Sequence, residues 1–287
     1  MNKLVSLLVI SGFVLAGCKQ APSDEPESDR QVDIRFSVST SSNSSLKSSG
    51  TVEEDAIGEI TLYGVNAGGA VVRTFPDVYI TSTGDTTLSM PASIVSLYAI
   101  ANSTADMDIQ THATAANLTA MTCDYAQAPE SPFVMSGNGA VIIGLTDNTA
   151  SIDLVRSIAK IVVAGEGGFV VDSIKVNNTP DQGFVLAQSS LAVPSSVRVD
   201  YDYIESDVCY VPENTTSDPT TLTVMGTYNS SDVEVPINFI VSGSPVPIER
   251  NKCYWVTIAP SPGHEVIVTI EIIDWDDEDI DTHYFDF

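Results

Sequence analysis

The chain has 287 residues, a formal net charge of −26, and 12 Lys plus Arg against 38 Asp plus Glu. Binding to nucleic acid or to anionic lipid headgroups requires clustered cations, so the sequence predicts neither, and its charge indicates an exposed surface kept soluble by mutual repulsion. Apolar residues amount to 43%, which is enough for packed cores, and the length favours two domains.

The amino terminus resembles a bacterial lipoprotein signal. Lys3 precedes an apolar run, residues 4–16, and the run ends in Leu15-Ala-Gly-Cys18. It is shorter than the roughly 18 residues that a membrane-spanning helix needs, so it predicts a signal peptide. Small residues ahead of a cysteine are similar to a lipobox, in which the thiol receives diacylglycerol. We therefore expect residues 1–17 to be removed and Cys18 to become a lipidated first residue.

An isolated strand follows an acidic spacer. Residues 19–30 are acidic and contain Pro, so they predict a disordered spacer; acidic residues at this place also resemble the surface-export signals of Bacteroidetes lipoproteins. Residues 31–40 alternate apolar and polar side chains, which predicts a strand with one buried face. That face comprises Val32, Ile34, Phe36 and Val38. The Ser-rich residues 41–50, which include Lys47, predict an exposed linker of the kind that proteases cut most readily.

The body of the chain is rich in strand and turn residues. Asn66-Ala-Gly-Gly69 separates two strand-like runs, which indicates a hairpin, and Gly165-Glu-Gly-Gly168 repeats this signal later. The Ala/Thr-rich residues 105–122 predict one short helix. Strand-like runs at regular spacing favour β-sandwiches. The sequence therefore predicts an all-β protein with one short helix.

We expect two body domains followed by a terminal segment. The first domain covers residues 48–154 and the second covers residues 155–275. Residues 276–287 begin with an acidic run and continue as a strand-like piece from Ile280 to Phe287. Bulky aromatic side chains on an unsupported tail are costly to leave exposed, so this piece should pack against something.

No catalytic or cofactor site is predicted. The three histidines, His112, His264 and His283, belong to different predicted elements. There is no Gly-x-Ser-x-Gly motif, no phosphate-binding loop and no dinucleotide fingerprint. A hydrolase would need a clustered catalytic set, which the sequence does not offer, so we expect a protein that is not an enzyme.

The acidic and sulfur-containing residues do not predict a metal site either. The late acidic residues lack the Gly and Glu of an EF-hand loop and indicate a solvated run; they are Asp274, Asp276, Asp277, Asp279 and Asp281. Besides Cys18 there are three cysteines, Cys123, Cys209 and Cys253. An odd number leaves at least one thiol unpaired. Cys209 and Cys253 could form a bridge, or all three could be buried free thiols.

Several segments in this order resemble the Bacteroidales fimbrillin family of major and accessory pilins. They are the lipobox Leu15-Ala-Gly-Cys18, the strand with its Ser/Asn-rich linker up to Lys47, the strand Ile57–Val65, the basic segment Leu154–Val163, the segment Ile248–Ile258 beginning Ile-Glu-Arg-Asn, and the late Trp275. The resemblance implies two transthyretin-like β-sandwich domains in tandem and a structural subunit of a cell-surface fimbria. The precursor would carry a lipid anchor in the outer membrane and would mature through a trypsin-like protease.

The resemblance also assigns roles to residues. Residues 18–47 would be a propeptide whose strand fills a groove until proteolysis, and residues 276–287 would be the donor strand that fills the same groove in the next subunit. Before cleavage, the groove would hold the side chains of Val32, Ile34, Phe36 and Val38. After cleavage, it would hold those of Ile280, Tyr284, Phe285 or Phe287 from the donor strand. Partners would be other fimbrial subunits, in a homopolymer or a mixed fimbria, with host or bacterial surface ligands.

The processing position departs from the best-known family members, which are cut after Arg. Cutting after Arg30 would leave the strand attached, and Arg35 lies within the strand, where paired backbone resists proteases. By elimination we predict cleavage at Lys47.

Two alternatives stay open at this point. The chain could be a permanently anchored surface lipoprotein that binds glycan or host protein through its loops, and would then keep residues 31–47. It could also be a tip or anchor subunit of a fimbria, because such subunits have the same two-domain body.

Overall fold

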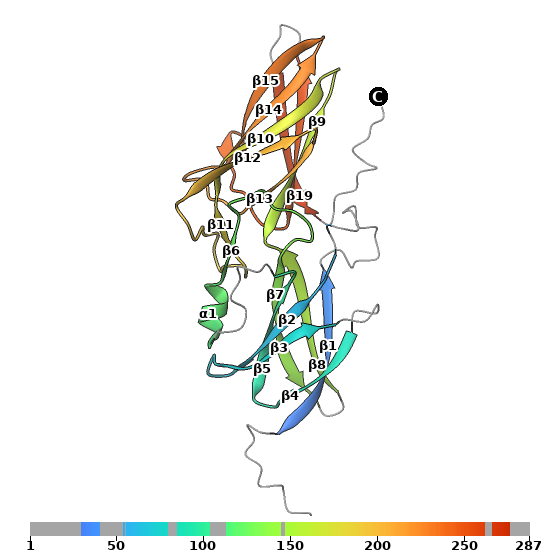
Figure 1. Ribbon diagram of the computed structural model, residues 1–287, viewed down its shortest axis with the longest axis vertical. Helices are drawn as coiled ribbons and strands as arrows, with labels where there is room; N and C mark the ends of the chain where they lie inside the picture. Colours follow the sequence, from blue (N-terminus) through green and yellow to red (C-terminus); the bar gives the residue numbers. More distant parts are fainter. Residues whose placement is uncertain are drawn as a thin grey trace, which may run out of the picture.

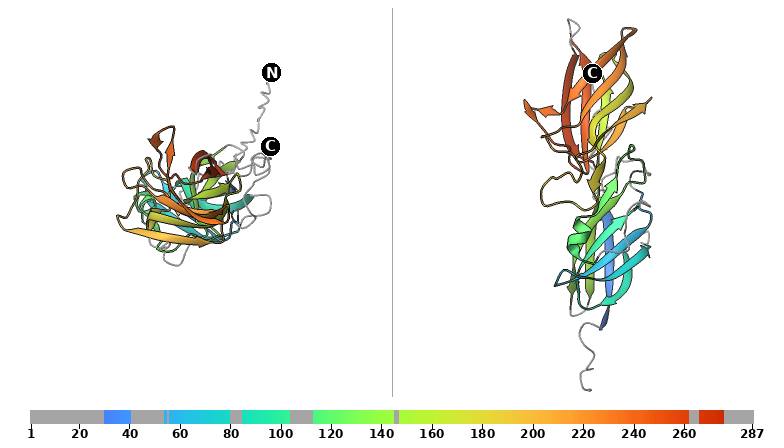
Figure 2. Two further views of the ribbon diagram at one scale, coloured as in Figure 1. Left: turned by 90° about the horizontal axis from the view of Figure 1, so that it is seen from above. Right: turned by 60° about the vertical axis from the view of Figure 1, so that its left-hand side comes forward.

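The computed structural model describes residues 30–40, 54, 56–79, 85–103, 113–144, 147–261 and 266–275. Two β-rich bodies lie end to end and give an elongated molecule (Figures 1 and 2). Among the described residues no helix has the length and apolarity needed to cross a membrane.

The amino-terminal body is built on one curved sheet of seven strands, in the order β3-β2-β5-β7-β8-β1-β4. Its elements are β1 (Gln31–Thr40), β2 (Ile60–Asn66), β3 (Val71–Val78), β4 (Asp85–Pro91), β5 (Ile94–Ala101), α1 (Ala115–Thr119), β6 (Thr122–Asp124), β7 (Met135–Ile143) and β8 (Asn148–Arg156). Side chains from β1, β4 and β8 share one core with side chains from β2 and β5. The sheet therefore curves over itself into two layers.

The carboxy-terminal body is a sandwich of two four-stranded sheets, β12-β10-β14-β15 and β13-β9-β18-β19. Its strands are β9 (Ile158–Gly165), β10 (Val170–Pro180), β11 (Gln182–Phe184), β12 (Arg198–Ile204), β13 (Val208–Pro212), β14 (Thr221–Tyr228), β15 (Ser231–Asn238), β16 (Ile240–Val241), β17 (Ser244–Pro245), β18 (Lys252–Pro260) and β19 (Val266–Asp274). Inward residues of both sheets, such as Ile161, Val224 and Val256, form its core. The all-β sandwich fold expected from the sequence is confirmed.

Local sequence explains the first hairpin. Asn66 ends β2, and its side-chain carbonyl accepts hydrogen bonds from the backbone N–H groups of Gly68 and Ala70, each at 3.0 Å. Gly69 has a φ of 79°, a conformation that glycine adopts without steric cost. The turn predicted at Asn66–Gly69 is confirmed.

The helix and one strand of the large sheet differ from expectation. The helix predicted within residues 105–122 is the five-residue α1, capped by the Thr114 side chain; residues 104–112 lie outside the described residues. Strand β4 was not predicted at all. Its sequence, Asp-Thr-Thr-Leu-Ser-Met-Pro, has few apolar residues, and it forms a strand by pairing along β1.

Candidate functional site

Strand β1 lies inside the amino-terminal sheet, between two strands distant in sequence. It runs parallel to β8, with Phe36 opposite Ala150, and antiparallel to β4, with Ile34 opposite Leu88. Both backbone edges of β1 are therefore paired with neighbouring strands. Figure 1 shows β1 starting at the pole farthest from the carboxy-terminal body and running toward the junction of the two bodies.

One face of β1 is part of the core. Ile34 and Phe36 are fully buried, and Val38 is 6% exposed, while Val32 packs against the same cluster from the margin. The predicted strand with one buried face is confirmed. Burying each of these larger side chains contributes about 1.5–3 kcal/mol, so their contacts retain β1 in the sheet.

Polar contacts at the exposed margin of the sheet also involve β1. The Ser39 hydroxyl bonds the Asp153 carboxylate, and the Asn148 side chain donates to the Asp33 carbonyl at 3.1 Å; both contacts are exposed. At the entry, Ala92 N–H donates to the Arg30 carbonyl at 2.8 Å. If β1 left, two open strand edges and an apolar groove would remain. An extended chain with alternating apolar side chains could occupy that groove.

The junction between the bodies is formed by an arm, residues 181–197, that leaves the carboxy-terminal sandwich. Within it β11 pairs antiparallel with β6, placing Gly183 opposite Cys123. Val185 N–H then donates to the Met121 carbonyl at 2.9 Å, and the Gln188 amide donates to the Thr119 carbonyl at 2.7 Å. The two bodies thus share a short β-ribbon.

Arg250 fastens the arm. Its guanidinium donates to the carbonyls of Val185 and Phe184 at 2.9 and 2.8 Å, and to the Glu213 carboxylate at 2.5 Å. The Arg250 side chain is 8% exposed and that of Glu213 13%. Charge-assisted bonds are stronger than neutral ones, so this contact holds the arm against the carboxy-terminal body.

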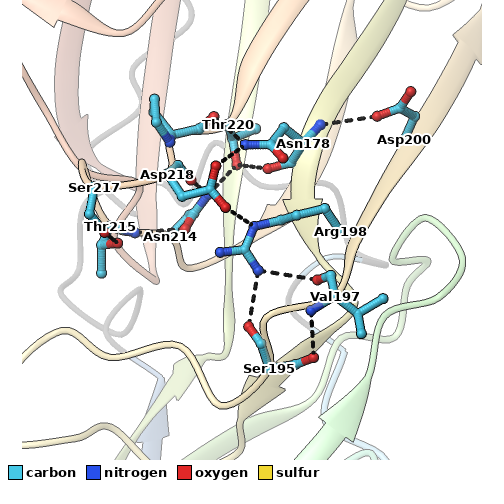
Figure 3. A network of polar contacts seen from close by, with 11 residues as sticks. Asn178, Ser195, Val197, Arg198, Asp200, Asn214, Thr215, Ser217, Asp218 and Thr220 are labelled. Carbon is cyan, nitrogen blue, oxygen red and sulfur yellow. Dashed lines mark hydrogen bonds and ion pairs between the residues drawn. The ribbon is translucent and has the colours of Figure 1, made fainter.

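A second polar network holds the base of the arm (Figure 3). Arg198 forms an ion pair with Asp218 at 2.9 Å and donates to the Ser195 carbonyl at 3.0 Å. Asn178 donates to Asp218 at 2.7 Å from a left-handed conformation with φ of 58°, at the bulge of β10. The network fixes backbone geometry, and its carboxylates face protein donors.

Residues of the segments that carried the resemblance meet at the junction. Arg156 donates to the Asn251 side-chain carbonyl at 3.0 Å. Asn251 N–H donates to the Ile158 carbonyl at 2.8 Å, and Trp275 N–H donates to the Asn251 carbonyl at 3.1 Å. Glu54, which sequence reasoning missed, lies among them at 3% exposure. A carboxylate flanked by two others, Glu53 and Asp55, gives no local signal of burial.

The three cysteines described are buried, and none of them forms a disulfide with another described residue. Cys209 belongs to the inner core of the sandwich and pairs with Ile161 of β9, whereas Cys253 lies on the far side of β9, opposite Lys160. Neighbouring residues along β9 point to opposite faces of the sheet, so Cys209 and Cys253 are not bridged. Burial raises the pKa of the Cys209 thiol far above its ordinary value.

Several predicted residues lie outside the described residues: Cys18, Lys47, Ile280, Tyr284, Phe285, Phe287 and the three histidines. Within the described ranges no group of three or more His, Cys, Asp or Glu residues could hold a metal ion. A groove of about 950 Å³ opens at the edge of the carboxy-terminal sandwich. It is lined by acidic residues such as Asp172 and Asp207 and by the exposed Val170 and Ile204.

The sequence and the fold were each compared with those of known proteins. No protein-family model and no curated protein matches the sequence. Among solved structures, the chain is similar to the tip fimbrial protein Mfa3 from Porphyromonas gingivalis with C-terminal truncation, at a TM-score of 0.61 and 16% identity, over 85% of this chain and 100% of that one.

Two further solved structures show the same likeness. A fimbrial assembly protein from Parabacteroides distasonis has a TM-score of 0.60 and 14% identity, over 85% of this chain and 99% of that one. A fimbrilin (fimA) from P. gingivalis has a TM-score of 0.52 and 14% identity, over 85% and 97%. The chain therefore has the fold of solved Bacteroidales fimbrial proteins.

Proposed function

We propose that the chain is a structural, non-enzymatic subunit of a cell-surface fimbria, polymerised by exchange of one strand between subunits. The observation that carries the proposal is β1. A strand supplied from far upstream occupies the interior of a sheet, buries Ile34 and Phe36 fully, and precedes a Ser-rich linker. Likeness of fold to a tip fimbrial protein, a fimbrial assembly protein and a fimbrilin supports the same function.

The proposed maturation begins at the outer membrane. Lipidation of Cys18 would anchor the exported precursor, and a trypsin-like protease would cut at Lys47. Before the cut, β1 competes for its groove at the high effective concentration of an intramolecular segment. After the cut that advantage is lost, because the strand becomes a separate peptide.

The proposed assembly step is insertion of residues 276–287, the donor strand, into the vacated groove of the next subunit. Main-chain hydrogen bonds to β8 and β4 supply affinity, and alternate side chains such as Ile280 and Tyr284 fill the pockets of the lost strand. The contact is head-to-tail and does not close into a ring, so it generates a fibre. The partners are other fimbrial subunits.

The rigid junction suits a shaft subunit. A fibre transmits tension through every subunit, and a body joined by a flexible linker would move within it. The arm with its Arg250 contacts opposes such movement. Tip and anchor positions remain alternatives within the same proposal, since the neighbours in fold include a tip protein.

The test is mass spectrometry of assembled material together with a truncation. We expect the mature chain to begin at Ser48 and to lack β1. Deleting residues 280–287 should abolish polymerisation of a shaft subunit and leave folding intact, whereas a terminal cap would still join a fibre. An assembled protein that starts at lipidated Cys18 would contradict strand exchange.

A second candidate is a permanently anchored lipoprotein that binds a glycan or a host protein. The open groove with exposed Val170 and Ile204 favours it, because exposed apolar residues beside a concave surface are typical of interaction sites. In that case residues 31–47 stay attached. Ligand binding by uncleaved monomers that never polymerise would favour this candidate.

A further inference from the structure

A buried carboxylate lies at the junction of the two bodies. Glu54 is 3% exposed and accepts a hydrogen bond from the Tyr210 hydroxyl at 2.5 Å. Its other carboxylate oxygen lies 3.4 Å from the Lys160 ammonium and 3.4 Å from the Trp275 indole nitrogen. Burying a carboxylate is costly without such partners, so its position is closely determined.

Trp275 completes this site from the other end of the chain. It is fully buried, and its ring is stacked on Tyr210 with centroids 5.8 Å apart. The Arg156 guanidinium lies 4.6 Å from the ring centroid and also donates from Nε to the Glu54 carbonyl at 3.3 Å. A desolvated cation over an indole face is among the stronger cation–π arrangements. We call Glu54, Arg156, Lys160, Tyr210 and Trp275 the junction cluster.

The junction cluster joins two places that matter to strand exchange. Glu54 comes shortly after Lys47, in the segment that would form the new amino terminus, and Trp275 immediately precedes residues 276–287. Arg156 ends β8 and Lys160 lies in β9, the two strands on either side of the connection between the bodies. One buried network therefore holds the chain just after the predicted cut and just before the donor strand.

We propose that the junction cluster is a positioning site for strand exchange. It keeps the new amino terminus on the body when β1 departs, and it fixes the root of the donor strand at the junction. This inference rests on the proposed function. Trp275 and Ile280 can lie at most about 18 Å apart when the chain between them is extended. The groove of the next subunit must then open within that distance of this junction, which makes the junction face the contact surface for a second copy.

The experiment compares two isosteric substitutions at buried ion pairs. Glu54→Gln removes the carboxylate charge from the junction cluster. Glu213→Gln is the matched control, because it removes the carboxylate that pairs with Arg250 at the same junction but contacts neither end of the exchange machinery. Unfolding curves of both precursors establish that each variant folds.

Two measurements follow proteolytic release of β1. One is the rate of self-polymerisation, which requires the attached donor strand. The other is binding of a synthetic peptide of residues 276–287 to cleaved chains that lack residues 280–287, which requires only the groove. We expect Glu54→Gln to slow polymerisation about tenfold, within the range of effects seen for coupled buried contacts. Peptide binding should stay at the wild-type level, and Glu213→Gln should polymerise at the wild-type rate.

The outcomes separate the two proposals. Suppose that the peptide binds every cleaved chain, the Glu54→Gln variant included. If Glu54→Gln then polymerises as fast as wild type, or if Glu54→Gln and Glu213→Gln slow polymerisation equally, the positioning role is wrong and strand exchange stands. If the peptide binds no cleaved chain, strand exchange itself fails and the inference falls with it. Should Glu54→Gln not fold, Trp275→Phe replaces it. This change removes the indole N–H bond to Glu54, keeps a ring in place, and should give the same split between the two measurements.

Discussion

Two interfaces of this molecule both use backbone strand pairing, but they differ in the side chains that stabilise them. Strand β1 is held in its sheet by main-chain bonds and by buried apolar side chains, chiefly Ile34 and Phe36, with peripheral polar contacts. The junction of the bodies pairs β6 with β11 and adds buried ion pairs, Arg250 with Glu213 and Lys160 with Glu54. The first interface depends on apolar alternation along β1, whereas the second depends on specific charged partners.

Under the proposed function, this difference would separate an exchangeable contact from a permanent one. Apolar burial is non-directional and tolerates a substitute of similar volume. A buried charge without its partner is strongly destabilising, so the junction cannot open part-way at low cost. The following predictions test this contrast, beginning with the largest effect.

Phe36→Ala should lower the free energy of unfolding of the uncleaved precursor by about 4 kcal/mol, because it leaves a cavity in the amino-terminal core. The same substitution should have no effect on the body once β1 has been released. Urea unfolding before and after proteolysis measures both. Asp33→Ala, at an exposed position of the same strand, is the control and should change the precursor by less than about 0.5 kcal/mol. An equal loss from both substitutions would show that β1 is not held by its apolar face.

Arg250→Ala should lower the free energy of unfolding by about 3 kcal/mol, because it leaves Glu213 without its ion-pair partner in a largely buried site. In contrast to the loss at Phe36, this loss should be the same with and without β1. Hydrogen exchange of residues 182–188 should increase at the same time. Arg250→Lys keeps the charge but loses the forked geometry, so an intermediate effect is expected. Unchanged exchange in the arm would refute the role of Arg250.

Gly139→Ala tests how closely β7 packs against β8, the strand with which β1 pairs. A Cβ at this position of β7 would lie 2.0 Å from the Ser151 carbonyl oxygen, so β8 would have to move. We expect about 2 kcal/mol of destabilisation from this overpacking and faster loss of β1 after cleavage. Gly68→Ala, where the nearest atom would be at an ordinary 3.4 Å, should be close to neutral. Differential scanning calorimetry of both variants gives the comparison.

The smallest effect concerns alkaline pH and the carboxy-terminal core. Burial raises the pKa of Cys209 in the folded chain, so its thiol stays neutral there while the unfolded thiol ionises above about pH 8.5. The stability it contributes is intact below that pH and should decline above it by up to about 1.4 kcal/mol per pH unit. Tyr201, Tyr203 and Tyr254, whose pKa values burial also raises, should add to the decline from about pH 10. Urea unfolding of Cys209→Ala should show a flatter dependence between pH 8.5 and 10; an unchanged slope would exclude the thiol.

Local patterns in the sequence predicted β1, the first hairpin and the strand-rich sandwiches, because each depends on alternation or on turn residues. Strand β4 was missed because it carries few apolar residues and depends on pairing with β1. The arm was missed for a related reason, since β11 pairs with β6 across a long sequence separation. Long-range pairing leaves little trace in local periodicity.

The junction cluster shows the same limit more sharply. Arg156, Lys160 and Trp275 belonged to segments singled out for their resemblance, but nothing in the sequence indicated that they meet around one carboxylate. Glu54 stands in a polar stretch, where a solvated side chain is the ordinary expectation. Its burial follows from four strands, β8, β9, β13 and β19, converging on it, which only the fold reveals.

The most direct test of strand exchange places a photoreactive group in the groove. Leu88 lies opposite Ile34 in the β4–β1 pairing, so Leu88→p-benzoyl-L-phenylalanine should cross-link to residues 31–40 in the uncleaved precursor. In assembled fibres the proposal predicts that the cross-linked peptide comes instead from residues 276–287 of another subunit. Fibres in which position 88 still cross-links to residues 31–40 would contradict it.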